Sequence, residues 1–98
     1  MPFSIVWSDE AERTALATSE YVAEHWPPSV LADYGMLIKQ VLANLEEKPE
    51  MYPKYQDTKY RRAPIHKTVA LFYEVAGEQV ILHRFHANRT DPQNLPGR

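Results

Sequence analysis

Residues 66–86, HKTVALFYEVAGEQVILHRFH, decide the fold of this chain. Residues 66–75 are rich in β-branched and aromatic side chains, a composition typical of a strand. Ala76-Gly77 supplies a tight turn, and residues 78–86 return as the final strand. The stretch therefore predicts a β-hairpin. We expect its first strand to supply core side chains, namely Val69, Leu71, Phe72 and Tyr73.

A loop and a further strand precede this hairpin. Residues 59–63 predict a short strand, which we expect Pro64 to end because proline has no amide hydrogen to donate. Residues 49–58, PEMYPKYQDT, hold two prolines and two tyrosines. We expect this segment to be a loop that is pinned to the body of the protein.

Two amphipathic helices are predicted before the loop. Ser8 is suited to cap the first helix, and this helix runs to about His25. Its apolar stripe repeats at the helical period. The stripe consists of Ala11, Ala15, Ser19, Val22 and Trp26, with Leu16 and Ala23 beside it.

Pro27-Pro28 separates the first helix from a second one, which runs from about Ser29 to Glu47. The second helix has the clearest apolar stripe of the sequence. It consists of Leu31, Tyr34, Ile38, Val41, Leu42 and Leu45. The short link between the helices predicts an antiparallel helical hairpin.

A short strand at Phe3–Trp7 completes the order β-α-α-β-β-β. This order predicts an α+β fold: a small twisted, mainly antiparallel sheet with a helical hairpin packed on one face. The 98 residues allow a single domain, residues 1–98, with a thin core. We expect the other face of the sheet to lack a cover.

Charge divides the chain into two halves. Residues 1–47 hold two Lys/Arg against eight Asp/Glu, and residues 48–98 hold nine Lys/Arg against five Asp/Glu. Such asymmetry is typical of a surface for an acidic partner or nucleic acid, or it is an incidental bias of solvated faces. The sequence pI near 6.1 lies far below the value of about 9 that is usual for nucleic-acid-binding domains.

Several kinds of chemistry are excluded or made improbable by the residues present. The chain has no cysteine, which excludes disulfides, thiolate metal sites and thiol catalysis. It has no glycine-rich phosphate loop and no GxSxG elbow. His83 and His86 are three residues apart on a predicted strand, so we expect them to point to opposite faces and to chelate a metal poorly. We therefore expect no metal and no cofactor.

The basic residues of the second half are the candidate binding groups. Strand alternation places Arg84 and His86 on one face of the last strand, with His83 and Phe85 on the other. An adjacent antiparallel strand brings Arg61 or Arg62 near this group. Converging guanidinium groups bind phosphates or carboxylates, and the alternative is a wet face that binds nothing. The full candidate set is Arg61, Arg62, Lys67, Arg84, His86 and Arg89.

Five segments follow one another in an order that is known from a toxin superfamily. They are IVWSDEAE (5–12), YVAEHWPPSV (21–30), LANLEEKPEMYPKY (42–55), RRAPIHKTVALFYEV (61–75) and VILHRFHANRTDPQNL (80–95). Over nearly its whole length the chain resembles the RelE/ParE superfamily of type II toxin–antitoxin toxins. The final strand followed by Asn-Arg and Asp-Pro-x-x-Leu resembles the ending of a ParE-like branch.

The resemblance implies a small toxin that a cognate antitoxin neutralises. RelE-like members cut mRNA on the ribosome with Lys and Arg residues and a tail Tyr, whereas ParE-like members poison DNA gyrase. This chain has Ala70 where the ribonucleases have an Arg, and no Tyr follows Tyr73. Arg89 alone has a plain match to the ribonuclease pattern. The resemblance therefore favours a ParE-like, non-nuclease toxin whose target contacts are Arg84, His86 and Arg89, supported by Arg61, Arg62 and Lys67.

Two alternatives remain. In a RelE-like endoribonuclease, Arg61, Arg84 and Arg89 hold the scissile phosphate, and His83 or His86 moves a proton. In a non-toxic module of the same fold, only antitoxin binding is kept. The expected partners are the antitoxin and DNA gyrase, or else the ribosome and mRNA, with a homodimer or a toxin–antitoxin hetero-oligomer as possible assemblies.

The sequence shows neither a signal peptide nor an apolar run long enough for a membrane span, so we expect a cytoplasmic protein without membrane contacts.

Overall fold

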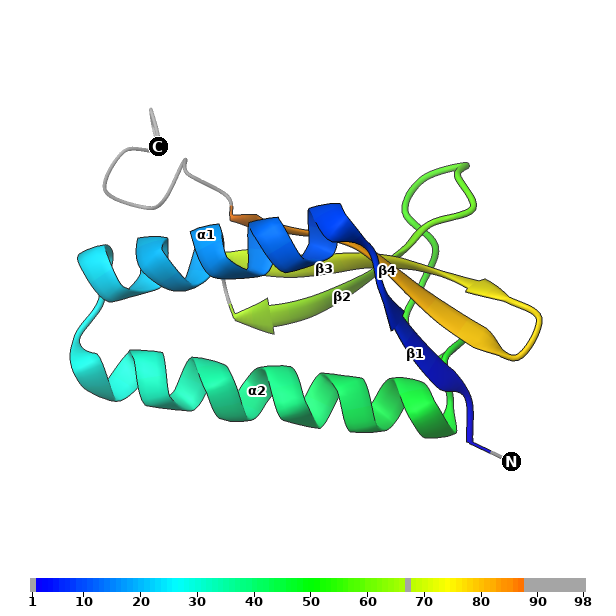
Figure 1. Ribbon diagram of the computed structural model, residues 1–98, viewed down its shortest axis with the longest axis horizontal. Helices are drawn as coiled ribbons and strands as arrows, with labels where there is room; N and C mark the ends of the chain where they lie inside the picture. Colours follow the sequence, from blue (N-terminus) through cyan, green and yellow to red (C-terminus); the bar gives the residue numbers. More distant parts are fainter. Residues whose placement is uncertain (1, 67, 88–98) are drawn as a thin grey trace.

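The computed structural model describes residues 2–66 and 68–87 of the chain. Within these residues, two helices and four strands follow one another in the predicted order (Figure 1). Their bounds are β1 Ser4–Trp7, α1 Asp9–His25, α2 Pro28–Glu47, β2 Arg61–His66, β3 Val69–Ala76 and β4 Gln79–Ala87. No helix of these described residues is long and apolar enough to cross a membrane.

The four strands form one mixed sheet in the order β1-β4-β3-β2. β1 runs parallel to β4, while the pairs β3–β4 and β2–β3 are antiparallel. The two helices form a hairpin on one side of this sheet, with α1 against β4 and α2 against β2 and β1 (Figure 1). The predicted α+β fold is therefore confirmed. We call the face of the sheet that is turned away from the helices the outer face.

Helix α1 begins where expected, but the stripe that it buries matches the predicted one only in part. Ser8 caps it by accepting a hydrogen bond from the Ala11 amide at 3.0 Å. Its buried residues are Ala11, Thr14, Thr18, Tyr21 and Val22, whereas Leu16 is 63% exposed. The predicted stripe was right for Ala11 and Val22, and Ala15 packs against the core beside them. It was wrong for Leu16, and it missed Thr14 and Thr18. The reason is that two threonine hydroxyls find partners in the interior, so these polar residues are buried.

Thr14 and Thr18 connect α1 to the rest of the core. The Thr14 hydroxyl donates to the Glu10 carbonyl at 2.7 Å and accepts from the Phe85 amide of β4 at 2.9 Å. The Thr18 hydroxyl shares a hydrogen bond of 2.8 Å with the Tyr34 hydroxyl of α2. Burial raises the pKa of Tyr34, and the bond to Thr18 partly offsets this. These side chains join both helices to the last strand.

The core lies between the helical hairpin and the sheet. Helix α2 buries Tyr34, Val41 and Leu45, which are part of its predicted stripe, while Leu31 at the start of the helix stays exposed. From the sheet the core receives alternate residues of β3 and β4. They are Val69, Leu71 and Tyr73 of β3 and Val80, Leu82 and Phe85 of β4.

Pro64 lies inside β2 and does not end it, contrary to the expectation. It pairs with Ala70, and the register shifts directly after it, between Pro64 and His66. β2 is the edge strand of the sheet. A proline is tolerated on an edge strand, because the amide hydrogen that it lacks is not needed for pairing on the open side of the strand.

Candidate binding site on the outer face of the sheet

The outer face carries a row of residues that crosses three strands. Arg62 of β2 lies opposite Phe72 of β3, and Phe72 lies opposite Arg84 of β4. Neighbouring strands are about 4.8 Å apart, so the two arginine backbones are separated by about 10 Å. Both arginines are exposed, and Phe72 between them is half-buried. This row brings two guanidinium groups to one face, as anticipated for Arg62.

A β-bulge in β4 places His83 on this outer face as well. Phe72 pairs with Arg84 and the next residue, Tyr73, pairs with Leu82, so His83 is the extra residue of β4. The bulge reverses the alternation along the strand: Val80 and Leu82 point to the core before it, and Phe85 does so after it. The expectation that His83 and His86 occupy opposite faces was therefore wrong.

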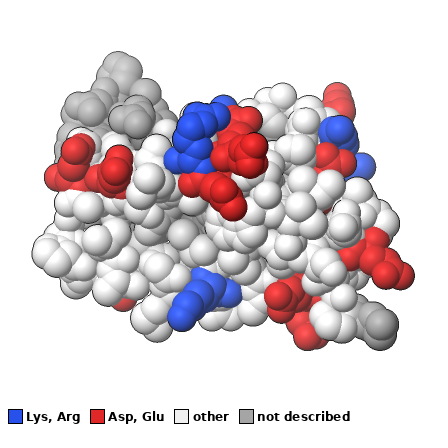
Figure 2. Space-filling view, in the orientation of Figure 1, with Lys and Arg blue, Asp and Glu red and all other residues white. Residues whose placement is uncertain are grey.

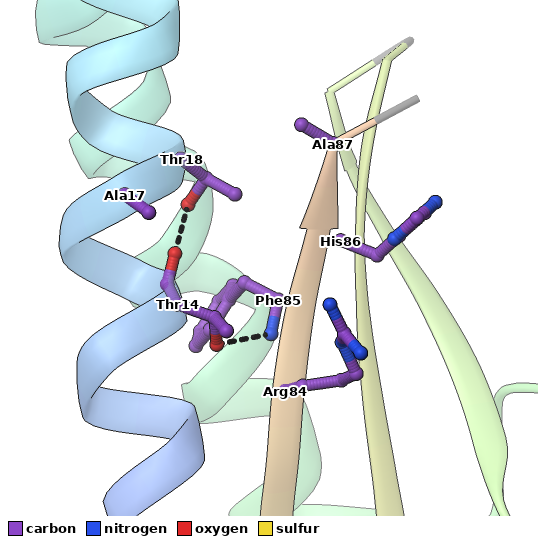
Figure 3. A pocket seen from close by; sticks show the side chains of 7 residues that line it. All are labelled: Thr14, Ala17, Thr18, Arg84, Phe85, His86 and Ala87. Atoms are coloured by element: carbon purple, nitrogen blue, oxygen red, sulfur yellow. Dashed lines mark hydrogen bonds between the residues drawn. The ribbon is translucent and has the colours of Figure 1, made fainter. Parts of the chain in front are cut away.

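His86 lies one row beyond Arg84, opposite Ala70, which in turn faces Pro64. Its ring is exposed and lies 6.4 Å from the Phe72 ring. Figure 3 shows Phe85 turned toward α1, whereas Arg84 and His86 extend from the other side of β4. We call Arg62, Arg84 and His86, grouped around Phe72, the cationic group of the outer face.

The carboxylate of Glu10 partly neutralises the cationic group. Its Oε2 lies 3.4 Å from Nη1 of Arg84, and both side chains are about half exposed. Such an exposed pair contributes little stability, of the order of 0–1 kcal/mol. The Arg84 guanidinium is therefore available to a carboxylate or phosphate that replaces Glu10.

A second carboxylate, Glu74 of β3, holds His83. Its Oε1 lies 2.7 Å from His83 Nε2 and 3.6 Å from Lys59 Nζ. The hydrogen bond from His83 lowers the pKa of Glu74, and Lys59 adds to this effect, while partial burial opposes it. His83 is thus fixed in orientation and shares its acceptor with a lysine, which leaves this nitrogen unsuited to proton transfer with a ligand.

Arg61 lies apart from the cationic group, because backbone carbonyls of the preceding loop hold its guanidinium. Its Nη1 donates to the Tyr52 carbonyl at 2.7 Å and to the Glu50 carbonyl at 3.4 Å. Tyr73 completes this clamp, because its hydroxyl donates to the Pro49 carbonyl at 2.6 Å. Arg61 therefore holds the loop between α2 and β2 against the sheet. The expectation that this loop is pinned is confirmed.

Two pockets flank Arg84. One has a volume of about 310 Å³ and lies between α1 and the end of β4, where Thr14, Thr18 and Phe85 line it (Figure 3). The other has a volume of about 380 Å³ and is lined by Tyr55, Tyr60 and Phe72, together with His83, Arg84 and Glu10. We call the second one the aromatic pocket.

No sequence pattern marked Tyr55, Tyr60 or Glu10 as site residues, and Phe72 was expected in the core. The alternation of side chains along β3 indicates that Phe72 lies on the outer face, since Leu71 and Tyr73 on either side of it are fully buried. No local pattern indicates that Tyr55 of the loop lies over Phe72, with ring centroids 5.1 Å apart.

Two candidate residues, Lys67 and Arg89, lie outside the described residues. Within residues 2–66 and 68–87, no three His, Asp or Glu side chains come close enough together to hold a metal ion. Acidic side chains, drawn in red, predominate on the side of the molecule shown in Figure 2. The acidic first half of the chain forms the helices, and the basic second half forms most of the sheet.

Several solved structures of toxin–antitoxin systems have a similar fold. The chromosomal ParDE system of P. aeruginosa matches with a TM-score of 0.68 at 12% identity, covering 87% of this chain and 95% of that one. The RelBE2 complex of Mycobacterium tuberculosis matches with a TM-score of 0.57 at 16% identity, covering 89% and 99%. The DinJ–YafQ complex of E. coli matches with a TM-score of 0.61 at 15% identity, covering 92% and 97%. These likenesses define the fold as that of the RelE/ParE toxins.

The sequence narrows this class further. The family model for the ParE toxin of the type II toxin–antitoxin system parDE matches residues 5–91. The chain therefore belongs to the ParE toxin family. No curated protein matches it in sequence.

Proposed function

We propose that this ParE-family toxin stops bacterial growth by binding a protein target, DNA gyrase, through the cationic group of the outer face. Arg62, Arg84 and His86 supply the contacts to acidic groups of the target. We further propose that a cognate antitoxin neutralises the toxin. The solved ParDE, RelBE2 and DinJ–YafQ structures are toxin–antitoxin systems or complexes, which supports such a partner.

The observation that carries the choice of a protein target is the pairing of the outer-face charges within the chain. Glu10 lies against Arg84, and Glu74 lies against His83 and Lys59. A nucleic-acid surface gains most of its affinity from unpaired cations that neutralise phosphates. A protein target exchanges one carboxylate for another on Arg84, which needs no excess of positive charge.

A second candidate function, RNA cleavage, is favoured by the bulge at His83. The bulge brings His83, Arg84 and His86 to one face of the sheet. A cation for the phosphate and a histidine for proton transfer are the minimum for such a reaction. In that case His83 or His86 is the proton-transfer group, because the hydrogen bond to Glu74 engages only Nε2 of His83 and the ring of His86 is exposed.

Pulse labelling after induction of the toxin alone tests both candidates. Incorporation of thymidine, uridine and methionine is followed over the first minutes. Early loss of thymidine incorporation with translation intact supports the gyrase target. Early loss of methionine incorporation, together with cleaved mRNA, contradicts it in favour of the nuclease. A culture that grows normally at full expression contradicts both and leaves the non-toxic module.

Point variants connect the effect to the outer face. Arg62→Ala and Arg84→Ala, singly and together, are expected to relieve the growth arrest at equal expression. Arg13→Ala is the matched control, because Arg13 is an exposed arginine of α1. A double variant that remains as toxic as the parent refutes the role assigned to the cationic group.

A further inference from the structure

The aromatic pocket lies between strands β3 and β4 and a loop that is held together by its own hydrogen bonds. The Tyr55 amide donates to the Tyr60 carbonyl at 2.8 Å, and the Thr58 hydroxyl donates to the Tyr55 carbonyl at 2.7 Å. Gln56 in this turn has a φ of 54°, a left-handed conformation that strains a residue other than glycine. The fold tolerates this strain in the turn that carries Tyr55. A strained backbone of this kind is typical of binding and switch segments.

The rings of this pocket form a preformed apolar surface on the outer face. Tyr55 stands edge-on to Phe72, with centroids 5.1 Å apart and planes at 81°. Tyr60 stands edge-on to His83, with centroids 4.7 Å apart and planes at 83°. Tyr55 nevertheless keeps 40% of its surface exposed, which is much for a large ring in such contacts. The pocket volume of about 380 Å³ lies at the lower end of the range of about 300–1,000 Å³ for ligand sites.

The charges of the pocket indicate what kind of group fits it. Arg84 and Glu10 both line it and lie 3.4 Å apart, while Glu74 holds His83 beside them. Glu10 therefore balances Arg84, and the pocket offers no excess of positive charge for a chain of phosphates. Three aromatic rings with one exchangeable arginine instead match an apolar anchor next to a carboxylate, since aromatic residues and arginine are the types enriched at the energetic centres of protein interfaces.

We infer that the aromatic pocket receives one large apolar side chain of the protein target, and that an acidic neighbour of this side chain replaces Glu10 on Arg84. The inference rests on the proposed function, because it gives the target an anchor on the same face as the cationic group. It adds Tyr55, Tyr60 and Phe72 to the contact residues. It also makes Glu10 a residue that occupies Arg84 until the target binds.

Direct binding of a small apolar probe tests the pocket without regard to toxicity. Indole is titrated into the full-length chain, and the NMR resonances of Tyr55, Tyr60 and Phe72 are followed. We expect saturable shifts of these resonances, and Tyr55→Ala weakens the binding at least about tenfold. Leu16→Ala, which truncates a leucine that is 63% exposed on α1, is the control and leaves binding unchanged.

The same titration with adenosine monophosphate distinguishes a nucleic-acid ligand. Tighter binding of the nucleotide than of indole at these resonances overturns the inference in favour of RNA. Absence of any saturable shift with indole on the unaltered chain overturns it as well. Neither result depends on whether a variant folds.

Growth arrest and antitoxin affinity then identify the occupant. Tyr55→Ala is expected to relieve the growth arrest, while its affinity for the cognate antitoxin stays within about threefold of the parent. If Tyr55→Ala still arrests growth fully, and the parent toxin causes early loss of thymidine incorporation, the inference about the pocket is refuted while the proposed function stands. A variant that loses antitoxin affinity but remains toxic assigns the pocket to the antitoxin and overturns the inference.

Discussion

Replacing Tyr73 by phenylalanine measures how strongly the sheet holds the loop that precedes β2. Tyr73 is fully buried, and its hydroxyl donates to the Pro49 carbonyl, which is also buried. The substitution keeps the ring and removes only this hydrogen bond, so a buried carbonyl loses its donor. We expect Tyr73→Phe to lower the free energy of unfolding by about 1–3 kcal/mol at pH 7.

The same variant has a distinct pH dependence. Burial raises the pKa of Tyr73 from 10.0 to about 12, an effect that Arg61 partly opposes. The unfolded chain therefore loses this proton near pH 10, while the folded chain keeps it up to about pH 12. This difference in pKa contributes to the free energy of unfolding: the contribution is fully present below pH 10 and disappears as the pH rises through 12. Its upper limit is about 2.7 kcal/mol, from about 1.36 kcal/mol for each unit of pKa.

Urea unfolding of the parent and of Tyr73→Phe between pH 7 and pH 12 checks both expectations. The difference in unfolding free energy is expected to be largest below pH 10 and to shrink above it. Tyr55→Phe is the control, because it makes the same change at an exposed ring of the loop. If Tyr73→Phe matches the parent within about 0.5 kcal/mol at pH 7, or if the two stability curves stay parallel up to pH 12, the assigned clamp is refuted.

Three further substitutions probe the core, the contact between α1 and β4, and the outer face. Leu45→Ala removes a fully buried side chain of α2, and urea unfolding is expected to show a loss of about 2–5 kcal/mol. Thr14→Val removes the acceptor of the Phe85 amide, so we expect a loss of about 1–3 kcal/mol and faster hydrogen exchange at this amide. Glu74→Gln is expected to make the free energy of unfolding fall less steeply in acid. The reason is that the lowered pKa of Glu74 stabilises the folded chain above pH 4.5, and this stabilisation disappears as the pH falls through the pKa of Glu74 in the folded chain. Unfolding midpoints of parent and variant between pH 7 and pH 3 that fall in parallel contradict this role.

Local patterns were sufficient to predict the elements of the fold. The helical period, the proline pair and the β-hairpin depend on residues that are close in sequence, and each lies within a few residues of its expected place. The order of elements then leaves few ways to pack a helical hairpin on a small sheet. Thr14 and Thr18 were missing from the predicted stripe of α1 because they are buried through their partners Phe85 and Tyr34, which lie 71 and 16 residues away in the sequence.

The amino-acid sequence by itself determined the α+β class, the acidic and basic halves and the resemblance to the RelE/ParE toxins. Only the tertiary structure decided which basic residues meet on the outer face. A single extra residue in β4 turned His83 to the side of Arg84, and strand register separated Arg62 from Arg61. The physical reason is that side chains alternate with a period of two along a strand, so one bulge or one step of register changes the face. Long-range hydrogen bonds settle such steps, and no local pattern records them.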